Sequence, residues 1–155
     1  MKKKVLFVAT VLRGHILVFH LPYMQWFQQQ GYEVHCCAGN DTDEPNPVIP
    51  FCDRYIEIPF ARSPLSRANR TAYRQLKALI DAEDYALLHC HTPVGGALTR
   101  LAARDARKRG TRVLYTAHGF HFYTGAPIKN WLFFYPAERF LARYTDLLIT
   151  INAED

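Results

Sequence analysis

The chain has 155 residues, a length that fits one domain with a substantial core. Hydrophobic residues make up 49% of it, which excludes a disordered chain, and its longest apolar runs are too short to span a bilayer. The net charge of +5 favours anionic partners such as phosphates, nucleotides, acidic lipids or nucleic acid. The alternative is that the basic residues only form solvent-exposed helix faces.

The basic N-terminus followed by apolar residues briefly resembles a signal peptide. Arg13, Gly14 and His15 stand where a small-residue cleavage site would be needed, so a first strand is the better interpretation. No C-x-x-C pair occurs, which favours reduced, buried thiols of a cytoplasmic protein over a zinc site. The cysteines concerned are Cys36, Cys37, Cys52 and Cys90.

Strand-like and helix-like segments alternate along the chain. In chain order we expect a strand at 4–10, a helix at 16–30, strands at 33–38 and 55–58, a helix at 66–83, a strand at 86–90, a helix at 94–109, a strand at 112–117, a helix at 128–144 and a strand at 146–151. Pro22 should kink the first helix or mark its true start, while Gly31 and Gly110 should end two helices. This alternation predicts an α/β fold, a Rossmann-like doubly wound parallel sheet of about six strands in the order 3-2-1-4-5-6.

The first loop, residues 10–15, follows a strand and precedes a helix, which is the usual location of a phosphate-binding turn. It contains Arg13 and a single glycine, Gly14, and it lacks the G-x-G-x-x-G fingerprint. A phosphate contact and a plain turn therefore both stay open.

Two histidines, His89 and His91, end the strand at 86–90, and strand alternation sends both to one face. They could bind a metal, but no third ligand lies close in sequence, so hydrogen-bonded structural histidines are the favoured interpretation. After Pro93, the pair Gly95 and Gly96 would let the next helix pack closely on the sheet or open its N-terminus to an anion.

A third site follows the strand at 112–117, which runs directly into His118, Gly119 and an aromatic loop containing His121. Ligands of open α/β sheets bind just beyond the carboxyl ends of the strands. A histidine there can donate or accept a hydrogen bond or exchange a proton near neutral pH. If the strand order is right, His89, His91 and His118 converge on one crevice, which favours a functional role.

The helix at 128–144 carries more aromatic residues than one core face requires: Trp131, Phe133, Phe134, Tyr135 and Phe140. Core packing explains some of them, and a lipid-facing or inter-domain surface would explain the rest. After the last strand, Asn152 could cap a further helix, so the chain resembles part of something longer.

In combination, these segments resemble the N-terminal domain of GT-B glycosyltransferases of family 4, closest to bacterial enzymes that build capsule, exopolysaccharide or O-antigen repeats. The resemblance covers essentially the whole chain. It rests on the order and spacing of KVLFVAT at 4–10, GYEV at 31–34, HCHTP at 89–93, YTAHGF at 115–120 and DLLITINAED at 146–155.

This resemblance implies two Rossmann-like domains that face each other across a cleft. The N-terminal domain, residues 1–155 here, would bind the acceptor. A C-terminal domain, absent from this sequence, would bind most of the nucleotide-sugar donor through a Glu-x7-Glu motif. Transfer in the family retains the anomeric configuration and usually needs no metal, so we expect no metal ligands and no cofactor.

The resemblance also implies roles for individual residues. His118 would be the catalytic contact to the donor sugar or the reacting hydroxyls. Gly14 would offer its backbone N–H to the donor diphosphate, although this loop has one glycine where many relatives have two, and Arg13 and His15 would flank that contact. The acceptor pocket would be shaped by His91, Gly119, His89 and His121.

We therefore expect the N-terminal half of a retaining glycosyltransferase that uses a nucleotide-sugar donor and a saccharide or lipid-linked acceptor in cell-surface polysaccharide synthesis. It should be inactive alone, and cytoplasmic with a possible peripheral contact to anionic membrane. The alternative is a non-catalytic subunit that anchors a two-chain enzyme to the membrane or presents its acceptor. A flavodoxin-like module lacks support because the phosphate-loop fingerprint is missing. A nucleic-acid partner is not expected, because the aromatic helix is not basic enough.

Overall fold

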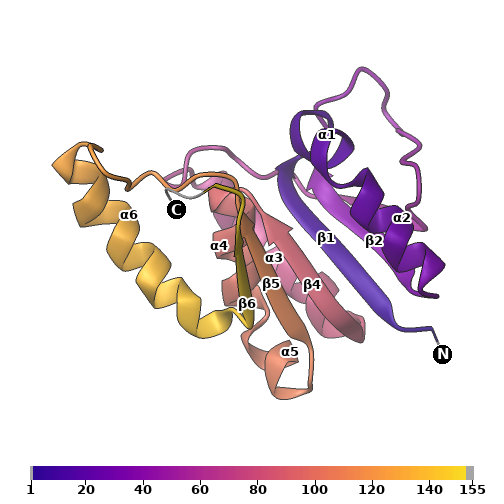
Figure 1. Ribbon diagram of the computed structural model, residues 1–155. Helices are drawn as coiled ribbons and strands as arrows, with labels where there is room; N and C mark the ends of the chain where they lie inside the picture. Colours follow the sequence, from indigo (N-terminus) through magenta and orange to yellow (C-terminus); the bar gives the residue numbers. More distant parts are fainter. Residues whose placement is uncertain (1, 153–155) are drawn as a thin grey trace.

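The computed structural model describes residues 2–152 and contains a six-stranded sheet in which every neighbouring pair is parallel (Figure 1). The order of the strands is β3-β2-β1-β4-β5-β6, which confirms the predicted doubly wound topology. Their bounds are β1 (Lys4–Val11), β2 (Glu33–Gly39), β3 (Arg54–Glu57), β4 (Tyr85–His91), β5 (Arg112–Ala117) and β6 (Leu147–Thr150).

The helical segments follow the predicted positions, but two expected helices are each divided. The segment expected at 16–30 breaks at His20, and Pro22 lies in the first turn of the second part, so it marks a helix start. The segment expected at 94–109 breaks at Ala103. The bounds are η1 (Leu12–Ile16, a π-helical turn), α1 (Leu17–Phe19), α2 (Leu21–Gln29), α3 (Ala68–Ala82), α4 (Pro93–Ala102), α5 (Arg104–Lys108), α6 (Ile128–Leu141) and η2 (Ala142–Tyr144, a 3₁₀ turn).

The central strands β1, β2, β4 and β5 are buried on both faces, which explains why they are nearly continuous apolar runs, whereas the edge strands β3 and β6 are largely exposed. Leu6 and Val8 of β1 belong to a core cluster shared with α3, α4 and α5, whereas Val5 and Phe7 belong to a second cluster shared with η1 and α2. Figure 1 shows α1 and α2 on one side of the sheet and α3 and α4 on the other. Three of the four cysteines lie in these cores, and all four are free thiols.

The pair Gly95 and Gly96 allows α4 to approach the sheet closely. A Cβ on Gly96 would lie 2.5 Å from Cε2 of Tyr115, and a Cβ on Gly95 would lie 3.2 Å from the carbonyl carbon of Ala9. Side chains larger than hydrogen would push the helix off β1 and β5. The close-packing explanation of these glycines is therefore supported.

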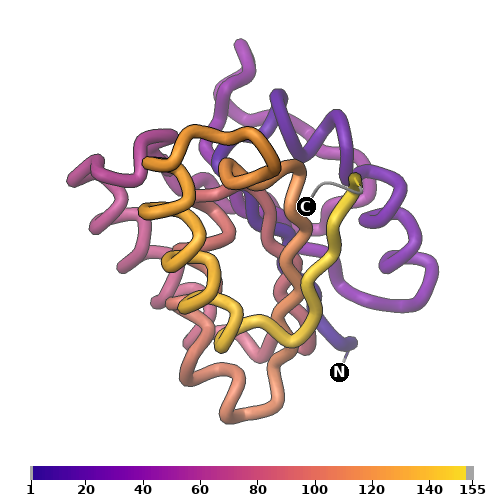
Figure 2. The backbone as a smooth tube through the Cα atoms, turned by 60° about the vertical axis from the view of Figure 1, so that its left-hand side comes forward, coloured from indigo at the N-terminus to yellow at the C-terminus, as the bar shows by residue number. Residues whose placement is uncertain are grey.

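Helix α6 lies along the outer side of the molecule (Figure 1 and Figure 2). A partly buried ion pair joins it to α4, with Arg100 1% and Glu138 18% exposed. Both terminal guanidinium nitrogens of Arg100 donate to the Glu138 carboxylate, at 2.7 and 3.0 Å. Leu141 is the one buried residue of α6. Core packing therefore does not account for its large apolar residues, which are exposed: Ile128, Trp131, Leu132, Phe133, Tyr135 and Phe140.

Within residues 2–152, no helix is both long and apolar enough to cross a membrane. The helix that Asn152 was expected to cap would lie outside the described residues.

Candidate functional site

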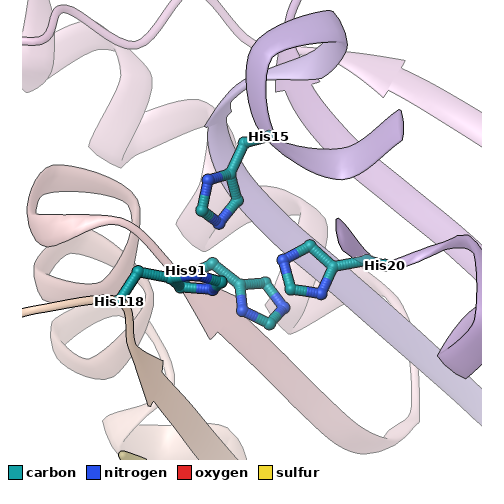
Figure 3. Close-up of side chains that lie close together, drawn as sticks. All are labelled: His15, His20, His91 and His118. Carbon is teal, nitrogen blue, oxygen red and sulfur yellow. The ribbon is translucent and has the colours of Figure 1, made fainter. Parts of the chain in front are cut away.

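Four histidines gather beyond the carboxyl ends of β1, β4 and β5 (Figure 3). This histidine cluster consists of His15, His20, His91 and His118, and one ring nitrogen from each lies within 4.8 Å of the others. Parallel strands place their carboxyl ends at one edge of the sheet, and the ligand sites of open α/β sheets lie at that edge. The cluster is therefore the candidate site of this domain.

The strands and first helices bring these four rings together. His91 is the last residue of β4, and His118 directly follows β5. His15 lies in the π-helical turn η1, and π-helical turns occur frequently at functional sites. His20 occupies the break before α2, where it stacks on His91 with ring centroids 3.6 Å apart, while the rings of His15 and His118 meet edge-on at 4.4 Å.

The cluster is largely shielded from solvent, and much of its hydrogen-bonding capacity is unused. His91 is 0% exposed and His20 is 2% exposed, and neither nitrogen of either ring has a hydrogen-bond partner in the described part of the chain. The same holds for Nε2 of His15 and Nε2 of His118. Buried polar atoms are usually satisfied, so these nitrogens require an explanation.

Burial also sets the charge of the cluster. Desolvation lowers the pKa of His15 to about 4 and the pKa of His20 to about 3, and it lowers the pKa of His91 well below its ordinary value. It lowers the pKa of the half-buried His118 as well. The four rings are therefore neutral near pH 7, and each carries one acceptor nitrogen and one N–H donor.

His89 lies next to the cluster, with its ring 4.2 Å from that of His91, so the predicted shared face is confirmed. Its Nε2 is 2.8 Å from Oγ1 of Thr116, and burial lowers its pKa to about 4. A hydrogen-bonded structural histidine describes His89 well. It does not describe His91, which has no such partner among residues 2–152.

The two remaining predicted residues, Gly119 and His121, both lie in the loop after β5 but in different surroundings. Gly119 has φ +122°, a conformation that favours glycine, and it is exposed beside His118. His121 lies outside the cluster: it is exposed and packs edge-on against Phe134 at 4.6 Å. The side chain of Asn130 donates to its carbonyl oxygen at 2.8 Å. The structure thus groups His121 with α6 rather than with the other histidines.

The first loop presents two backbone N–H groups to one carboxylate. The N–H groups of Arg13 and Gly14 donate to the two oxygens of Asp41, the latter at 3.1 Å, and the Arg13 side chain pairs with exposed Asp43 at 2.7 Å. Successive N–H groups that point at one anion form a typical anion-binding concavity. The loop predicted to contact a phosphate therefore holds an anionic group here, supplied by the segment after β2.

Sequence reasoning missed His20 and Asp41. The pattern at 16–30 indicates a helix through Leu17, Leu21 and Met24, and a histidine inside such a segment gives no sign that the helix breaks at its position. Asp41 stands in a polar loop whose path sequence patterns do not define. The only usable signal was Pro22, which favours a helix start two residues after His20.

Comparison with known proteins places this fold in a family. Residues 4–152 match the family model described as glycosyl transferase 4-like. The whole chain is 57% identical to EpsD of Bacillus subtilis (strain 168), a protein named as a glycosyltransferase, and spans 39% of the length of that relative.

Solved structures resemble the chain in fold at low sequence identity. MurG of Acinetobacter baumannii matches 98% of the chain with a TM-score of 0.61 and 18% identity, and the match covers 44% of that protein. The UDP-GlcNAc 2-epimerase of Methanocaldococcus jannaschii matches 98% with a TM-score of 0.62 and 12% identity, over 40% of its length. The chain belongs to the glycosyl transferase 4-like family and has the fold of the N-terminal, Rossmann-like part of a GT-B protein.

Proposed function

We propose that this domain is the acceptor-binding half of a retaining glycosyltransferase. It would help move a sugar from a nucleotide-sugar donor to a saccharide acceptor, carried on a lipid, in the synthesis of a cell-surface polysaccharide. One observation carries this proposal. The N–H groups of Arg13 and Gly14, which bind an anionic group, and the neutral histidine cluster lie together at the ligand-binding edge of the sheet.

In this proposal the N–H groups of Arg13 and Gly14 bind the donor diphosphate in place of the Asp41 carboxylate. Both are oxygen anions that accept two hydrogen bonds, so one set of donors suits both. Donors aimed at the departing diphosphate would stabilise the charge that develops on it during transfer. Asp41 is then a competitor that the donor displaces.

His118 is proposed to contact the donor sugar and the reacting hydroxyls. It is the least buried member of the cluster, and the adjoining Gly119 lets the backbone approach a ligand. Because its ring is neutral near pH 7, it can donate one hydrogen bond and accept another, as a sugar hydroxyl requires. His91 and Gly119 would shape the acceptor side, and the role of His118 is to bind and orient.

Most of the donor affinity is assigned to a second domain, on the same polypeptide or on a partner chain. Closure of the two domains would position the acceptor hydroxyl against the donor sugar. Residues 1–155 alone are therefore proposed to be catalytically silent. The work of the domain would take place in the cytoplasm.

Replacing Asp41 by Asn is expected to strengthen the binding of a nucleoside diphosphate to the two-domain protein by about tenfold, or about 1.4 kcal/mol. The substitution removes the negative charge that occupies the N–H pair of Arg13 and Gly14. Isothermal titration of UDP, GDP and dTDP into the wild-type protein and into the Asp41→Asn variant measures the change in Kd.

Glu44→Gln is the matched control, because it removes the same charge from an exposed residue three positions along the same segment. It is expected to change Kd by less than about twofold, as screened surface charges do. Equal effects of the two variants would contradict the assignment of the first loop to the donor diphosphate.

A non-catalytic membrane-anchoring subunit is the second candidate, and one observation favours it. Helix α6 exposes a row of large apolar side chains, with Ile128 79%, Leu132 67% and Phe133 75% exposed, and basic Lys129 and Arg139 lie on the same helix. Exposed apolar side chains beside basic ones mark an interaction surface, here proposed to face anionic lipid. The two candidates differ in one measurable respect, since only an enzyme half loses sugar transfer when His118 is replaced.

A further inference from the structure

The histidine cluster has the composition of a metal site. Neutral imidazole nitrogens are ligands of Zn²⁺, Cu²⁺, Ni²⁺ and Fe²⁺, and four of them form a complete tetrahedral set. Histidines alone supply the cluster, so a soft thiolate-bound metal and an oxygen-bound Mg²⁺ or Ca²⁺ are both poor matches.

The positions of the four rings come close to what a metal ion needs. A tetrahedral ion with bonds of about 2.0–2.1 Å holds its ligand atoms about 3.4 Å apart. The four nitrogens lie within 4.8 Å of one another, so the widest pair would close by no more than about 1.4 Å. Figure 3 shows the rings converging from two sides, with His15 and His20 on one and His91 and His118 on the other.

The unpaired nitrogens are the second, independent observation. His91 is completely buried, and neither of its nitrogens has a partner within residues 2–152. A buried polar atom without a partner costs about 1–3 kcal/mol. His15, His20 and His118 each contribute at least one further nitrogen of this kind. An ion at their centre would satisfy one nitrogen of each ring at once.

We propose that His15, His20, His91 and His118 bind one divalent transition-metal ion of the zinc class. This inference does not depend on the proposed function. It revises our expectation from sequence, which disfavoured a metal at His89 and His91 because no third ligand lies close in the chain. The fold supplies the missing ligands from η1 and from the break before α2.

With four protein ligands the site is closed, as structural zinc sites are. The ion would fasten η1 and the start of α2 to the ends of β4 and β5. His118 is the partly exposed member and presents a buried Nε2. With Nε2 on the ion, its Nδ1–H would donate one hydrogen bond to a substrate oxygen, in place of the donor and acceptor pair of the metal-free ring. Metal-bound histidines commonly donate that second N–H to an oxygen acceptor.

The test is metal titration of the protein prepared without a polyhistidine tag and stripped with a chelator. Isothermal titration with Zn²⁺ is expected to give one ion per chain. The visible spectrum with Co²⁺ is expected to show the intense bands of a four-coordinate ion. Thermal unfolding should shift upward with stoichiometric Zn²⁺, because an ion that binds only the folded state stabilises it.

Three variants decide the assignment. His20→Ala and His118→Ala should each weaken Zn²⁺ binding by at least about 100-fold, by loss of a ligand. His118→Ala keeps the test valid if the deeply buried His20 variant fails to fold. His121→Ala should bind like the wild type, because His121 lies outside the cluster. No stoichiometric binding by the wild type, or binding that survives His118→Ala in a folded chain, would overturn the proposal.

Discussion

Acidification from pH 7 to pH 5 is expected to remove about 5 kcal/mol from the free energy of unfolding, a large part of the stability of many domains. The cause is three buried neutral histidines whose pKa values are lowered by desolvation, His15, His20 and His89. Burial of His91 acts in the same direction. In the unfolded chain each would take up a proton near pH 6.5. In the folded chain the first three protonate only near pH 3 to 4.

The sign follows from proton binding. Between pH 6.5 and about 4 the unfolded chain binds more protons than the folded chain, so stability falls as the pH falls, by up to about 1.4 kcal/mol per pH unit for each histidine. Above pH 6.5 the contribution is complete and stability levels off. Urea unfolding at pH 7.5, 6.5, 6.0, 5.5 and 5.0, in the presence of a chelator, measures the slope.

A pair of variants separates this cause from general acid sensitivity. His20→Phe should reduce the slope of the unfolding free energy against pH by about 1.4 kcal/mol per pH unit, because one proton fewer is taken up on unfolding. His121→Phe should leave it unchanged, because His121 is exposed. A free energy of unfolding that stays constant between pH 7 and pH 5 would contradict the burial of neutral histidines.

Glu138→Ala is expected to lower the free energy of unfolding by about 3–5 kcal/mol, because it leaves a buried guanidinium without its carboxylate. Arg100 is 1% exposed and also donates from Nε to the Gly96 carbonyl at 3.0 Å, while its guanidinium lies 4.0 Å from the centre of the Tyr115 ring. It cannot turn toward water without leaving these contacts. Chemical denaturation followed by far-UV circular dichroism measures the loss.

Two comparisons test this explanation. Asp43→Ala breaks the exposed pair with Arg13 and should cost no more than about 1 kcal/mol. The double variant Arg100→Met with Glu138→Leu removes both buried charges and should be less destabilised than Glu138→Ala alone. If Glu138→Ala costs no more than Asp43→Ala, the pair does not hold α6 on α4.

The strand order and most of the elements followed from the sequence, because the signals were local. Apolar runs broken by Gly31 and Gly110 set the limits of strands and helices, and the alternation of elements permits few topologies. Both glycines have positive φ, at +82° and +106°. Pro22 indicated that a helix could start just after His20, whereas nothing in the sequence indicated the break at Ala103, because alanine favours continuation of a helix.

Only those residues of the site whose positions follow from the order of the strands were predictable from the sequence. Once β4 and β5 are neighbours, His91 and His118 must meet at one edge of the sheet. The contributions of His20 and Asp41 depend on the paths of η1 and of the loop after β2, which periodicity does not encode. For the same reason His121, three residues after His118, was grouped with it in the sequence but packs on α6 instead.

The measurement that tests the central claim most directly is sugar transfer by this domain together with the proposed donor-binding domain, from a panel of nucleotide sugars to saccharide lipids extracted from the source cells. His118→Ala is expected to lower kcat by about 10²- to 10³-fold, the effect of losing one hydrogen-bonding group at a transferring centre. His121→Ala should retain nearly full activity. Transfer that is unchanged in a folded His118→Ala protein would contradict the claim that the histidine-lined edge of this domain is where the sugar is transferred.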